Sequence, residues 1–398
     1  MRMISRAGSR VARAALGLSA AMALALTACS TSTDAVTSAP ESTAASGSEI
    51  VIGVDLPLSG PSSSAAEKMR KGFELAAAEI NDAGGVNGSR IVLDFQDDAG
   101  DPTTGVALVD KFVQNGAVAI VGTYNSPVVL AQSDAVAAAK IPQLAFAVSS
   151  AIAEKKNPWV FQTGPTDVGQ IDGIVARLKK LGLSRPALLT DTPAFGTTAK
   201  PLLEEKLSAA GLTPVLSDTF ATDAADLSSV LLKVKQSGAD AVVAWTVGTP
   251  YATLGKGAQQ VGLGLPIFGS ASAADPSVPE LAGPAADEIY FQSVIDNDKP
   301  AVREVAQRWA SEFPEGVPSE AFQARDMLTV IVDGVRAVGP DRARLRDYLE
   351  TYSSSELLSG RVDSVWKYSA DNHVGLGGEN LVWNVYRAGV VQVVDDGS

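Results

Sequence analysis

Few side chains in this sequence have the type and spacing that enzymatic chemistry requires. His373 is the only histidine, and it follows Asp371 and Asn372 in a polar segment that predicts a solvent-exposed turn rather than a catalytic base. The adjacent carboxylates Asp97 and Asp98 point in opposite directions on a strand, which is poor geometry for paired acid and base catalysis. The sequence contains no nucleophile elbow, dinucleotide fingerprint or phosphate loop. We therefore predict that the protein is not an enzyme.

Ser126 and Pro127 predict the start of a helix that has the chemistry of an anion site. The Ser126 hydroxyl and the backbone N–H groups of Val128 and Val129 would converge at the helix N-terminus, where the helix dipole favours a carboxylate. The alternative is that Ser126 only caps its own helix. The residues alone leave both interpretations open.

Cys29 is the only cysteine and closes the run Leu26-Thr27-Ala28-Cys29. The segment before it carries four arginines and an apolar stretch over 14–26, which is typical of a signal peptide and too short to span a bilayer. Because the run resembles a bacterial lipobox, we expect residues 1–28 to be removed as a leader and the Cys29 thiol to be acylated. The mature protein would then be attached by lipid to the outer face of the cell membrane. The alternative is an ordinary cleavage site beside an unmodified thiol.

Composition limits the remaining chain. Residues 29–48 are mostly Ser, Thr and Ala, which predicts a disordered tether. The formal net charge of −13 becomes −17 once a leader with four arginines and no acid is removed, and this field disfavours nucleic-acid binding. A single cysteine excludes an intramolecular disulfide. We expect no metal and no cofactor.

From Glu49 onward, short β-branched runs alternate with segments of helical periodicity. A capping box of Ser64 and Glu67 predicts one helix start, and Asp101 followed by Pro102 predicts another. The segment 301–349 is predicted to be helical, whereas 362–394 alternates as strands do. Strands are predicted at Ile50–Val54, Ile91–Phe95, Ala117–Val121, Ile141–Leu144, Ala187–Leu189 and Ala241–Trp245. This order predicts an α/β fold with parallel sheets and two doubly wound lobes.

Several motifs resemble the N-terminal signature of the Leu/Ile/Val-binding family, the type I periplasmic solute-binding proteins of ABC importers. The motifs are Gly53-Val54-Asp55-Leu56-Pro57-Leu58-Ser59-Gly60-Pro61, Gly72-Phe73-Glu74-Leu75-Ala76, Gly84-Gly85-Val86-Asn87-Gly88 and Asp97-Asp98-Ala99-Gly100-Asp101-Pro102. The resemblance implies two lobes joined by a hinge of three crossovers, near Gly164, Ser293 and Tyr368. The N-terminal lobe would comprise 49–166 plus 293–368, and the C-terminal lobe 167–292 plus 369–398.

The resemblance also implies a ligand site in a cleft between the lobes. Ser126 matches the family's carboxylate-binding serine, Ala147 a backbone acceptor, and Ser149 a hydroxyl residue that touches both ends of the ligand. On the other lobe, Phe195 matches an aromatic residue that closes over the ligand, while Gly248 and Thr249 occupy another contacting loop.

One departure from the family concerns charge. Ala271 stands where amino-acid binders of the family place a glutamate against the ligand ammonium, and an unpaired ammonium ion in a closed cleft is costly. Either the ligand lacks an ammonium group, or Asp191 or Asp275 replaces the glutamate.

These features predict an extracytoplasmic, monomeric lipoprotein that delivers a small carboxylate, amide or amino acid to the permease of an ABC importer by hinge closure. The alternatives are a ligand-sensing receptor domain of the same fold and, less favoured by the motifs, an α/β enzyme.

Overall fold

The computed structural model describes residues 48–192, 195–275, 277–313 and 317–394 of the 398-residue chain. The predicted leader, Cys29 with its predicted acylation, and the predicted tether apart from Ser48 lie outside the described residues. Among the described helices, none is both long and apolar enough to cross a membrane.

A five-stranded sheet forms the first half of the architecture. Its strands run in the order β2-β1-β3-β4-β5, and every neighbouring pair is parallel. The strands are β1 (Glu49–Leu56), β2 (Arg90–Asp97), β3 (Ala119–Gly122), β4 (Gln143–Ala145) and β5 (Val160–Gln162). The predicted continuous apolar run at 117–121 becomes the fully buried β3, as expected of a parallel strand covered on both faces.

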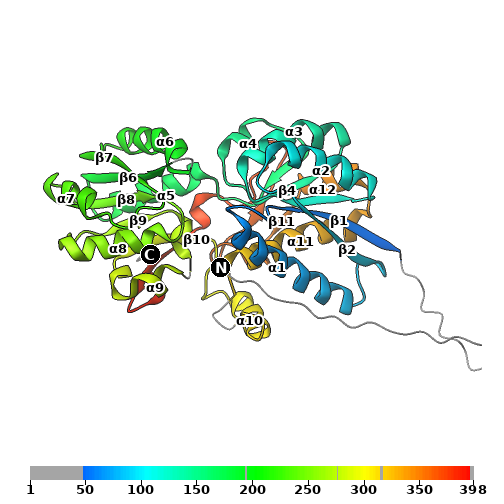
Figure 1. Cartoon of the computed structure of the whole chain (residues 1–398). Helices are drawn as coiled ribbons and strands as arrows, with labels where there is room; N and C mark the ends of the chain where they lie inside the picture. The colour runs from blue at the N-terminus through cyan, green and yellow to red at the C-terminus, as the bar shows by residue number, and fades with distance from the viewer. Residues whose placement is uncertain (1–47, 193–194, 276, 314–316, 395–398) are drawn as a thin grey trace, which may run out of the picture. The chain divides into compact units, whose positions relative to one another are not determined.

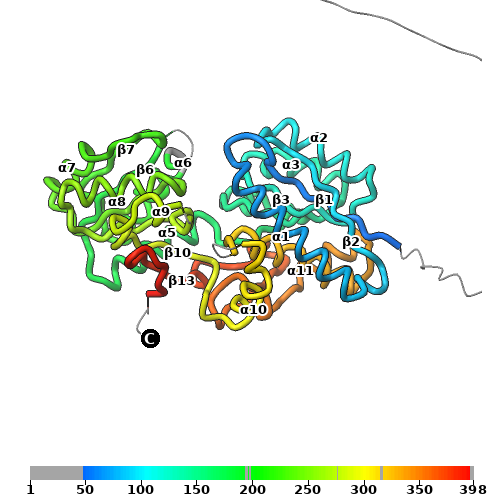
Figure 2. Tube along the Cα trace, turned by 60° about the horizontal axis from the view of Figure 1, so that its bottom comes forward, coloured from blue at the N-terminus to red at the C-terminus, as the bar shows by residue number. Residues whose placement is uncertain are grey.

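Helices cover both faces of this sheet (Figure 1). One core packs α1 (Ser63–Asp82), α11 (Ser319–Val338) and α12 (Arg342–Leu349) against the sheet, and the other packs α2 (Pro102–Gln114), α3 (Ser126–Ala139) and α4 (Ser150–Glu154) against it. Helices α1 and α11 lie side by side in both overall views (Figures 1 and 2). A Cβ added to Gly72 would lie 2.5 Å from the Ala321 carbonyl oxygen, so the absence of a side chain at Gly72 lets the two helices approach closely.

A seven-stranded sheet forms the second half and repeats the strand order of the first. Its order is β14-β13-β10-β9-β8-β6-β7, with β6 to β10 parallel and β13 and β14 added antiparallel at one edge. The strands are β6 (Pro186–Thr192), β7 (Leu216–Ala221), β8 (Ala241–Trp245), β9 (Ile267–Gly269), β10 (Ile289–Ser293), β13 (Val382–Arg387) and β14 (Val390–Val393). The prediction of an α/β fold built on parallel sheets is confirmed.

The second sheet is also covered on both faces. Helices α5 (Asp167–Lys180) and α6 (Phe195–Ala209) pack in one core, and α7 (Ser228–Gln236), α8 (Pro250–Val261) and α9 (Ser277–Ala282) pack in the other. The remaining elements are α10 (Pro300–Trp309), the two-residue strands β11 (Ser353–Ser354) and β12 (Trp366–Lys367), and three 3₁₀ turns at Ala271–Ala274, Gly283–Ala286 and Gly378–Asn380.

The chain passes between the two sheets three times. It leaves the first sheet after β5, returns to the first core after β10, and enters the second sheet again at β13. Tyr368 and Leu376 both pack in the core of the first sheet. The third passage therefore lies between Leu376 and β13, after the position near Tyr368 that was expected from the sequence. The predicted strand pattern over 362–394 is realised only at β12, β13 and β14, because the intervening chain is held by turns and isolated bridges.

Local signals succeed at one predicted helix start and fail at another. Asp101 is the N-cap of α2, and its Oδ1 accepts the Thr104 N–H at 2.7 Å, with Pro102 in the first turn. The prediction of a capping box formed by Ser64 and Glu67 is wrong. Helix α1 begins at Ser63, and its N-cap Ser62 makes no side-chain capping hydrogen bond.

Asp101→Ala is expected to lower the free energy of unfolding by about 1 kcal/mol, because the N–H of Thr104 loses its partner. Urea denaturation measures this change. The matched substitution Ser64→Ala removes no capping hydrogen bond and should change the free energy of unfolding by less than about 0.5 kcal/mol. Equal effects of the two substitutions would contradict the assignment.

Candidate ligand-binding site

Each sheet has one position where the strand order reverses, and ligands of doubly wound sheets bind at such positions, beyond the carboxyl ends of the strands. In the first sheet the position lies between β1 and β3, and in the second between β6 and β8. The segment after β3 carries Ser126, and the segment after β8 carries Gly248 and Thr249. Three of the residues predicted from the sequence therefore follow strands at these reversal points.

The two backbone donors of the anion site considered at Ser126 already have partners within the protein. Helix α3 begins at Ser126 with Asn125 as its N-cap, and the N–H groups of Val128 and Val129 both donate to the Asn125 carbonyl oxygen, at 3.0 and 3.3 Å. These two donors are not free for a ligand. Ser126 does not cap its own helix either; its Oγ accepts the Ser149 N–H at 3.3 Å. The hydroxyl remains partly exposed and can still donate its own proton.

Ser149 and Ala147 lie beside Ser126, in the segment that follows β4. The Nε2 of Gln162 donates to the carbonyl oxygens of Ala147, at 2.7 Å, and Ser149, at 3.1 Å. A carbonyl oxygen has two lone pairs, so this bond leaves Ala147 able to accept a second donor. Gln162 is a buried residue of β5 that the sequence analysis did not identify. Its two hydrogen bonds hold the backbone of Ala147 and Ser149 in place.

An aromatic pair stands next to these serines and was also missed from the sequence. The rings of Tyr124 and Phe146 stack at 5.1 Å between centroids with an interplanar angle of 18°. Burial, followed by the negative charges of Glu320 and Asp275, raises the pKa of Tyr124 to about 12. Glu320 begins α11, against the first sheet, whereas Asp275 follows β9 of the second sheet. The Tyr124 phenol is thus within electrostatic reach of carboxylates from both halves of the fold.

The second sheet contributes a glycine and an acid in direct contact. A Cβ at Gly248 would lie 2.8 Å from Asp275 Oδ2, so the carboxylate rests against the glycine backbone. Asp275 Oδ1 accepts the Ser277 N–H at 2.8 Å, which fixes the side chain, and the group remains partly exposed. Thr249 is exposed and is the N-cap of α8 without a capping hydrogen bond from its side chain. Phe195 begins α6, and its side chain lies outside what the structure describes.

Asp191 and Asp275 are the two acids that the sequence left open as partners for a ligand ammonium, and they differ in their existing bonds. Asp191 is buried, its Oδ1 accepts the Gly196 N–H at 2.7 Å, and its Oδ2 accepts the Thr246 hydroxyl at 2.7 Å. Both carboxylate oxygens of Asp191 therefore already accept hydrogen bonds, from a residue after β6 and a residue after β8. Asp275 keeps one carboxylate oxygen with no hydrogen bond to the described residues, which makes it the better placed of the two.

A family model described as "Periplasmic binding protein" matches residues 49–376, which is most of the chain. The chain belongs to the periplasmic binding protein family. Family membership indicates an extracytoplasmic location. The family and its fold are those of substrate-binding proteins.

Curated relatives of this periplasmic binding protein carry related names. Leu/Ile/Val-binding protein homolog 3 of Brucella melitensis is 26% identical over 348 residues, which are 82% of this chain and 94% of the relative. Leu/Ile/Val-binding protein BraC3 of Rhizobium johnstonii is 26% identical over 297 residues, 73% of this chain and 80% of the relative.

A solved structure supports the fold assignment of this periplasmic binding protein. The branched-chain amino acid transporter substrate binding protein LivJ of Streptococcus pneumoniae, in complex with isoleucine, superposes with a TM-score of 0.75 at 20% identity, covering 87% of this chain and 99% of that one. At this identity the match shows the fold alone.

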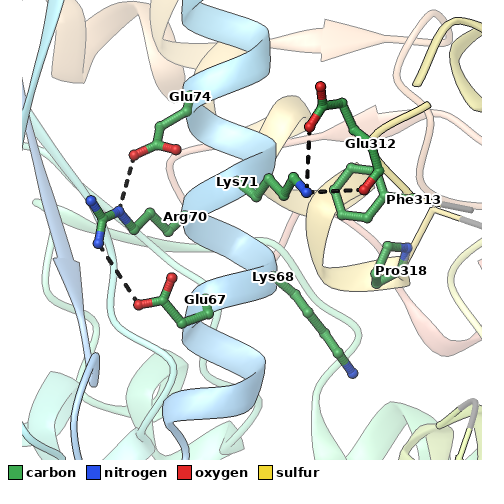
Figure 3. Close-up of a pocket in the computed structure, with 8 residues that line it drawn as sticks. All are labelled: Glu67, Lys68, Arg70, Lys71, Glu74, Glu312, Phe313 and Pro318. Atoms are coloured by element: carbon green, nitrogen blue, oxygen red, sulfur yellow. Dashed lines mark hydrogen bonds and ion pairs between the residues drawn. The ribbon is translucent and has the colours of Figure 1, made fainter. Parts of the chain in front are cut away.

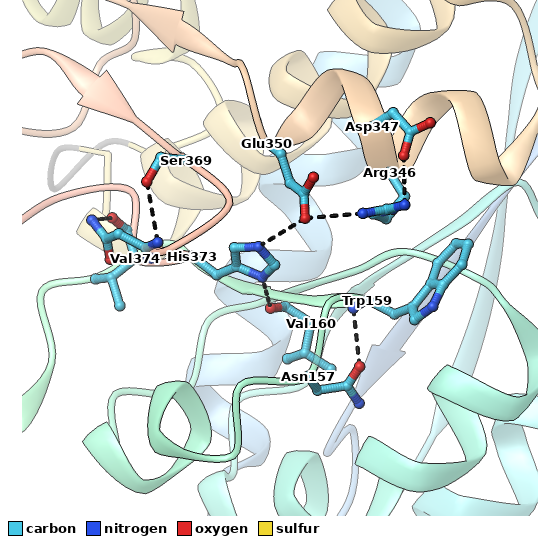
Figure 4. A network of polar contacts seen from close by, with 10 residues as sticks. Asn157, Trp159, Val160, Arg346, Asp347, Glu350, Ser369, His373 and Val374 are labelled. Atoms are coloured by element: carbon cyan, nitrogen blue, oxygen red, sulfur yellow. Dashed lines mark hydrogen bonds and ion pairs between the residues drawn. The ribbon is translucent and has the colours of Figure 1, made fainter.

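His373 of this periplasmic binding protein is not solvent-exposed as predicted, since its side chain is only 13% accessible. Figure 4 shows it between Val160, whose carbonyl oxygen lies 2.9 Å from Nδ1, and Glu350, whose Oε1 lies 3.6 Å from Nε2. Its ring stacks on Phe161 at 4.1 Å, and its own carbonyl oxygen accepts the Gln162 N–H at 2.8 Å. His373 therefore anchors the segment before the third passage to β5.

An open pocket of about 560 Å³ lies elsewhere in this periplasmic binding protein, between α1 and the chain that follows α10 (Figure 3). None of the predicted ligand residues lines it. Most of its charged side chains pair with one another, Arg70 with Glu67 and Glu74 and Lys71 with Glu312, and Lys68 lies 4.0 Å from Glu320 outside the pocket. The described residues contain no group of three or more acids, histidines or cysteines arranged to hold a metal ion.

Proposed function

We propose that this periplasmic binding protein captures a small ligand with a carboxylate group and delivers it to the permease of an ABC importer. The observation that carries the proposal is the repeated strand order of the two sheets. Each sheet has a reversal point, and Ser126 follows the strand at one while Gly248 and Thr249 follow the strand at the other. The names of the relatives, which refer to leucine, isoleucine and valine, support an amino acid as the ligand.

We assign roles to the predicted residues as part of this proposal. The hydroxyls of Ser126 and Ser149 donate to the ligand carboxylate, and the Ala147 carbonyl oxygen accepts from its polar group. Phe195, Gly248 and Thr249 contact the ligand from the second sheet. Asp275 pairs with a ligand ammonium, since one of its carboxylate oxygens accepts no hydrogen bond from the described residues, whereas Ala271 has no acceptor in its side chain.

The proposed mechanism is hinge closure. The two sheets with their helices act as lobes, with a division near that expected from the sequence, and the ligand stabilises the closed form because it then contacts both. The Cys29 lipid would keep the protein, as a monomer, at the outer face of the membrane beside its permease. No turnover of the ligand is expected.

Isothermal titration calorimetry tests the function. Purified residues 30–398 are titrated with leucine, isoleucine, valine, phenylalanine, their deaminated carboxylates and their amides. We expect one class to bind with a Kd in the micromolar range or below, a more compact shape by solution scattering on binding, and an unchanged ligand after incubation. Ser126→Ala should weaken binding by roughly 10-fold, the effect of one lost hydrogen bond to a charged group. Failure of every solute to bind, or an unchanged radius of gyration, contradicts the proposal.

A further inference from the structure

Two of the proposed ligand residues, Ala147 and Ser149, lie in a segment that is hydrogen-bonded on either side of the first passage between the sheets. On one side lies Gln162, the last residue of β5. Its Nε2 donates to the carbonyl oxygens of Ala147, at 2.7 Å, and Ser149, at 3.1 Å. We refer to Ala147–Ser150 as the clamp segment.

Asp167, the first residue of α5, binds the same segment from the other side of the passage. Its Oδ1 accepts the Ser150 N–H at 3.0 Å, and its own N–H donates to the Val148 carbonyl oxygen at 2.9 Å. Helix α5 packs on the second sheet, whereas Gln162 belongs to the first. The clamp segment is therefore bonded to both halves of the fold.

The backbone of Gln162 is bonded to the chain that leads to the third passage. Its N–H donates to the His373 carbonyl oxygen at 2.8 Å. Its carbonyl oxygen accepts the Gly375 N–H at 2.9 Å and the Tyr368 hydroxyl at 3.0 Å. Because the first passage also begins directly after β5, Gln162 lies where two of the three passages meet. A shift of Gln162 is passed to the clamp segment through the side-chain amide.

Packing alone does not explain a glutamine at this position. The Gln162 side chain is 1% exposed, and its Oε1 has no donor among the described residues, which is costly for a buried acceptor. The opposite orientation of the amide would place Oε1 against two carbonyl oxygens, so Nε2 must face the clamp segment. What the amide contributes is therefore its two bonds to the clamp segment.

We propose that Gln162 and Asp167 are positioning residues that couple the angle between the two lobes to ligand binding, by holding the clamp segment across the first passage. This inference rests on the proposed function for the ligand. Rotation of one lobe against the other moves Asp167 relative to Gln162, and the clamp segment cannot then keep its bonds to both unchanged. The Ser149 N–H, which donates to Ser126 Oγ at 3.3 Å, moves with the clamp segment.

The coupling acts in both directions, as linkage requires. A ligand that binds the Ala147 carbonyl oxygen and the Ser149 hydroxyl favours the lobe angle at which the bonds to both halves are made. In the absence of ligand, the same bonds restrict the range of angles that the lobes adopt. Loss of the bonds from Gln162 or Asp167 should therefore widen that range and weaken binding together.

Distances between spin labels test the restriction without any ligand. Residues 30–398 contain no cysteine, so Asp110→Cys on α2 and Leu232→Cys on α7 introduce two labelling positions, both exposed and on different sheets (Figure 1). Double electron–electron resonance should give a wider distance distribution for Gln162→Met and for Asp167→Ala than for the labelled wild type. Methionine keeps the length of glutamine without its donor, and alanine removes the carboxylate.

Two further variants separate coupling from a general loss of structure. Asp167→Asn keeps an oxygen for the Ser150 N–H and should restore the narrow distribution. Gln292→Met is the matched control, because Gln292 on β10 is also buried and also has an Oε1 without a donor among the described residues. Its Nε2 donates to the Gln170 carbonyl oxygen at 2.8 Å, on α5 rather than in the clamp segment, so this variant should keep the wild-type distribution.

Titration with L-leucine tests the link to binding. The Kd should rise roughly 5- to 150-fold in Gln162→Met and Asp167→Ala, and by less than about 2-fold in Asp167→Asn and Gln292→Met. Wild-type distance distributions in Gln162→Met and Asp167→Ala overturn the proposal even if the Kd rises, because the two residues would then only support the clamp segment. A wider distribution with an unchanged Kd overturns it as well.

Two other outcomes remain decisive. If Gln162→Met does not fold, Asp167→Ala and its rescue by Asp167→Asn decide the proposal, since Asp167 is partly exposed. If L-leucine does not bind the wild type, the proposed amino-acid ligand fails, while the distances measured without ligand still decide whether the clamp segment restricts the lobes.

Discussion

Asp326→Ala is expected to lower the free energy of unfolding by about 3 to 5 kcal/mol, the effect of breaking a buried charge network by removing one partner. Asp326 is 1% exposed on α11, and its two oxygens accept the N–H groups of Leu358, at 2.8 Å, and Ser359, at 2.7 Å. Lys299 is 5% exposed, and burial lowers its pKa while the negative charge of Asp326 acts to raise it. The substitution leaves two buried backbone donors without their acceptor and removes a negative charge that acts on the buried Lys299.

Urea denaturation of Asp326→Ala measures this effect, provided that the slope of the transition is unchanged. Asp333→Ala on the same helix is the matched control. Its ion pair with Arg336 is partly exposed, and its other oxygen accepts the Tyr352 hydroxyl at 3.2 Å. That variant should lose only about 1 kcal/mol. If Asp326→Ala lowers the free energy of unfolding by no more than Asp333→Ala does, the buried hydrogen bonds of Asp326 do not stabilise the fold as we expect.

The Asp326 network illustrates what the sequence could not predict. Asp326 and Ser359 are 33 positions apart, and nothing in the periodicity of a helix reveals which acid on it will be met by two backbone N–H groups from a distant loop. The same holds for Gln162, whose side chain donates to two carbonyl oxygens beyond β4. His373 was wrongly predicted to be exposed because its polar neighbours suggested a turn, while Phe161 and Glu350 surround it only in the folded chain.

The fold itself was more accessible from the sequence because its signals are local. Parallel strands covered on both faces must be apolar throughout, so β3 and β8 are visible as continuous runs. Asp101 and Pro102 specify a helix start within four residues, without help from distant contacts. Ser126 shows the limit of such signals. Its local sequence predicted a helix cap or an anion site, but Asn125 occupies the cap, and the hydroxyl is oriented by Ser149 from the next loop.

Asp275→Asn is expected to weaken binding of an amino acid ligand by roughly 30- to 1,000-fold, equivalent to about 2 to 4 kcal/mol, as for loss of one member of a buried charge pair. The physical reason is that Asp275 is fixed by Ser277 and packed against Gly248, so a ligand ammonium would meet a carboxylate that needs no reorganisation. Asp191 is not expected to compensate, because Gly196 and Thr246 occupy its two oxygens.

Two ligands and two variants make the test of Asp275 specific. The tightest-binding amino acid is compared with the carboxylate in which hydrogen replaces its amino group. Wild type should prefer the amino acid strongly, Asp275→Asn should bind both with similar affinity, and Glu280→Gln, an exposed position on α9, should behave as wild type. Because the substitution changes only the charge that meets the ammonium, an equal loss of affinity for both ligands would mean that Asp275 supports the loop rather than the ligand. No loss for either would place the recognition of the ammonium at another residue.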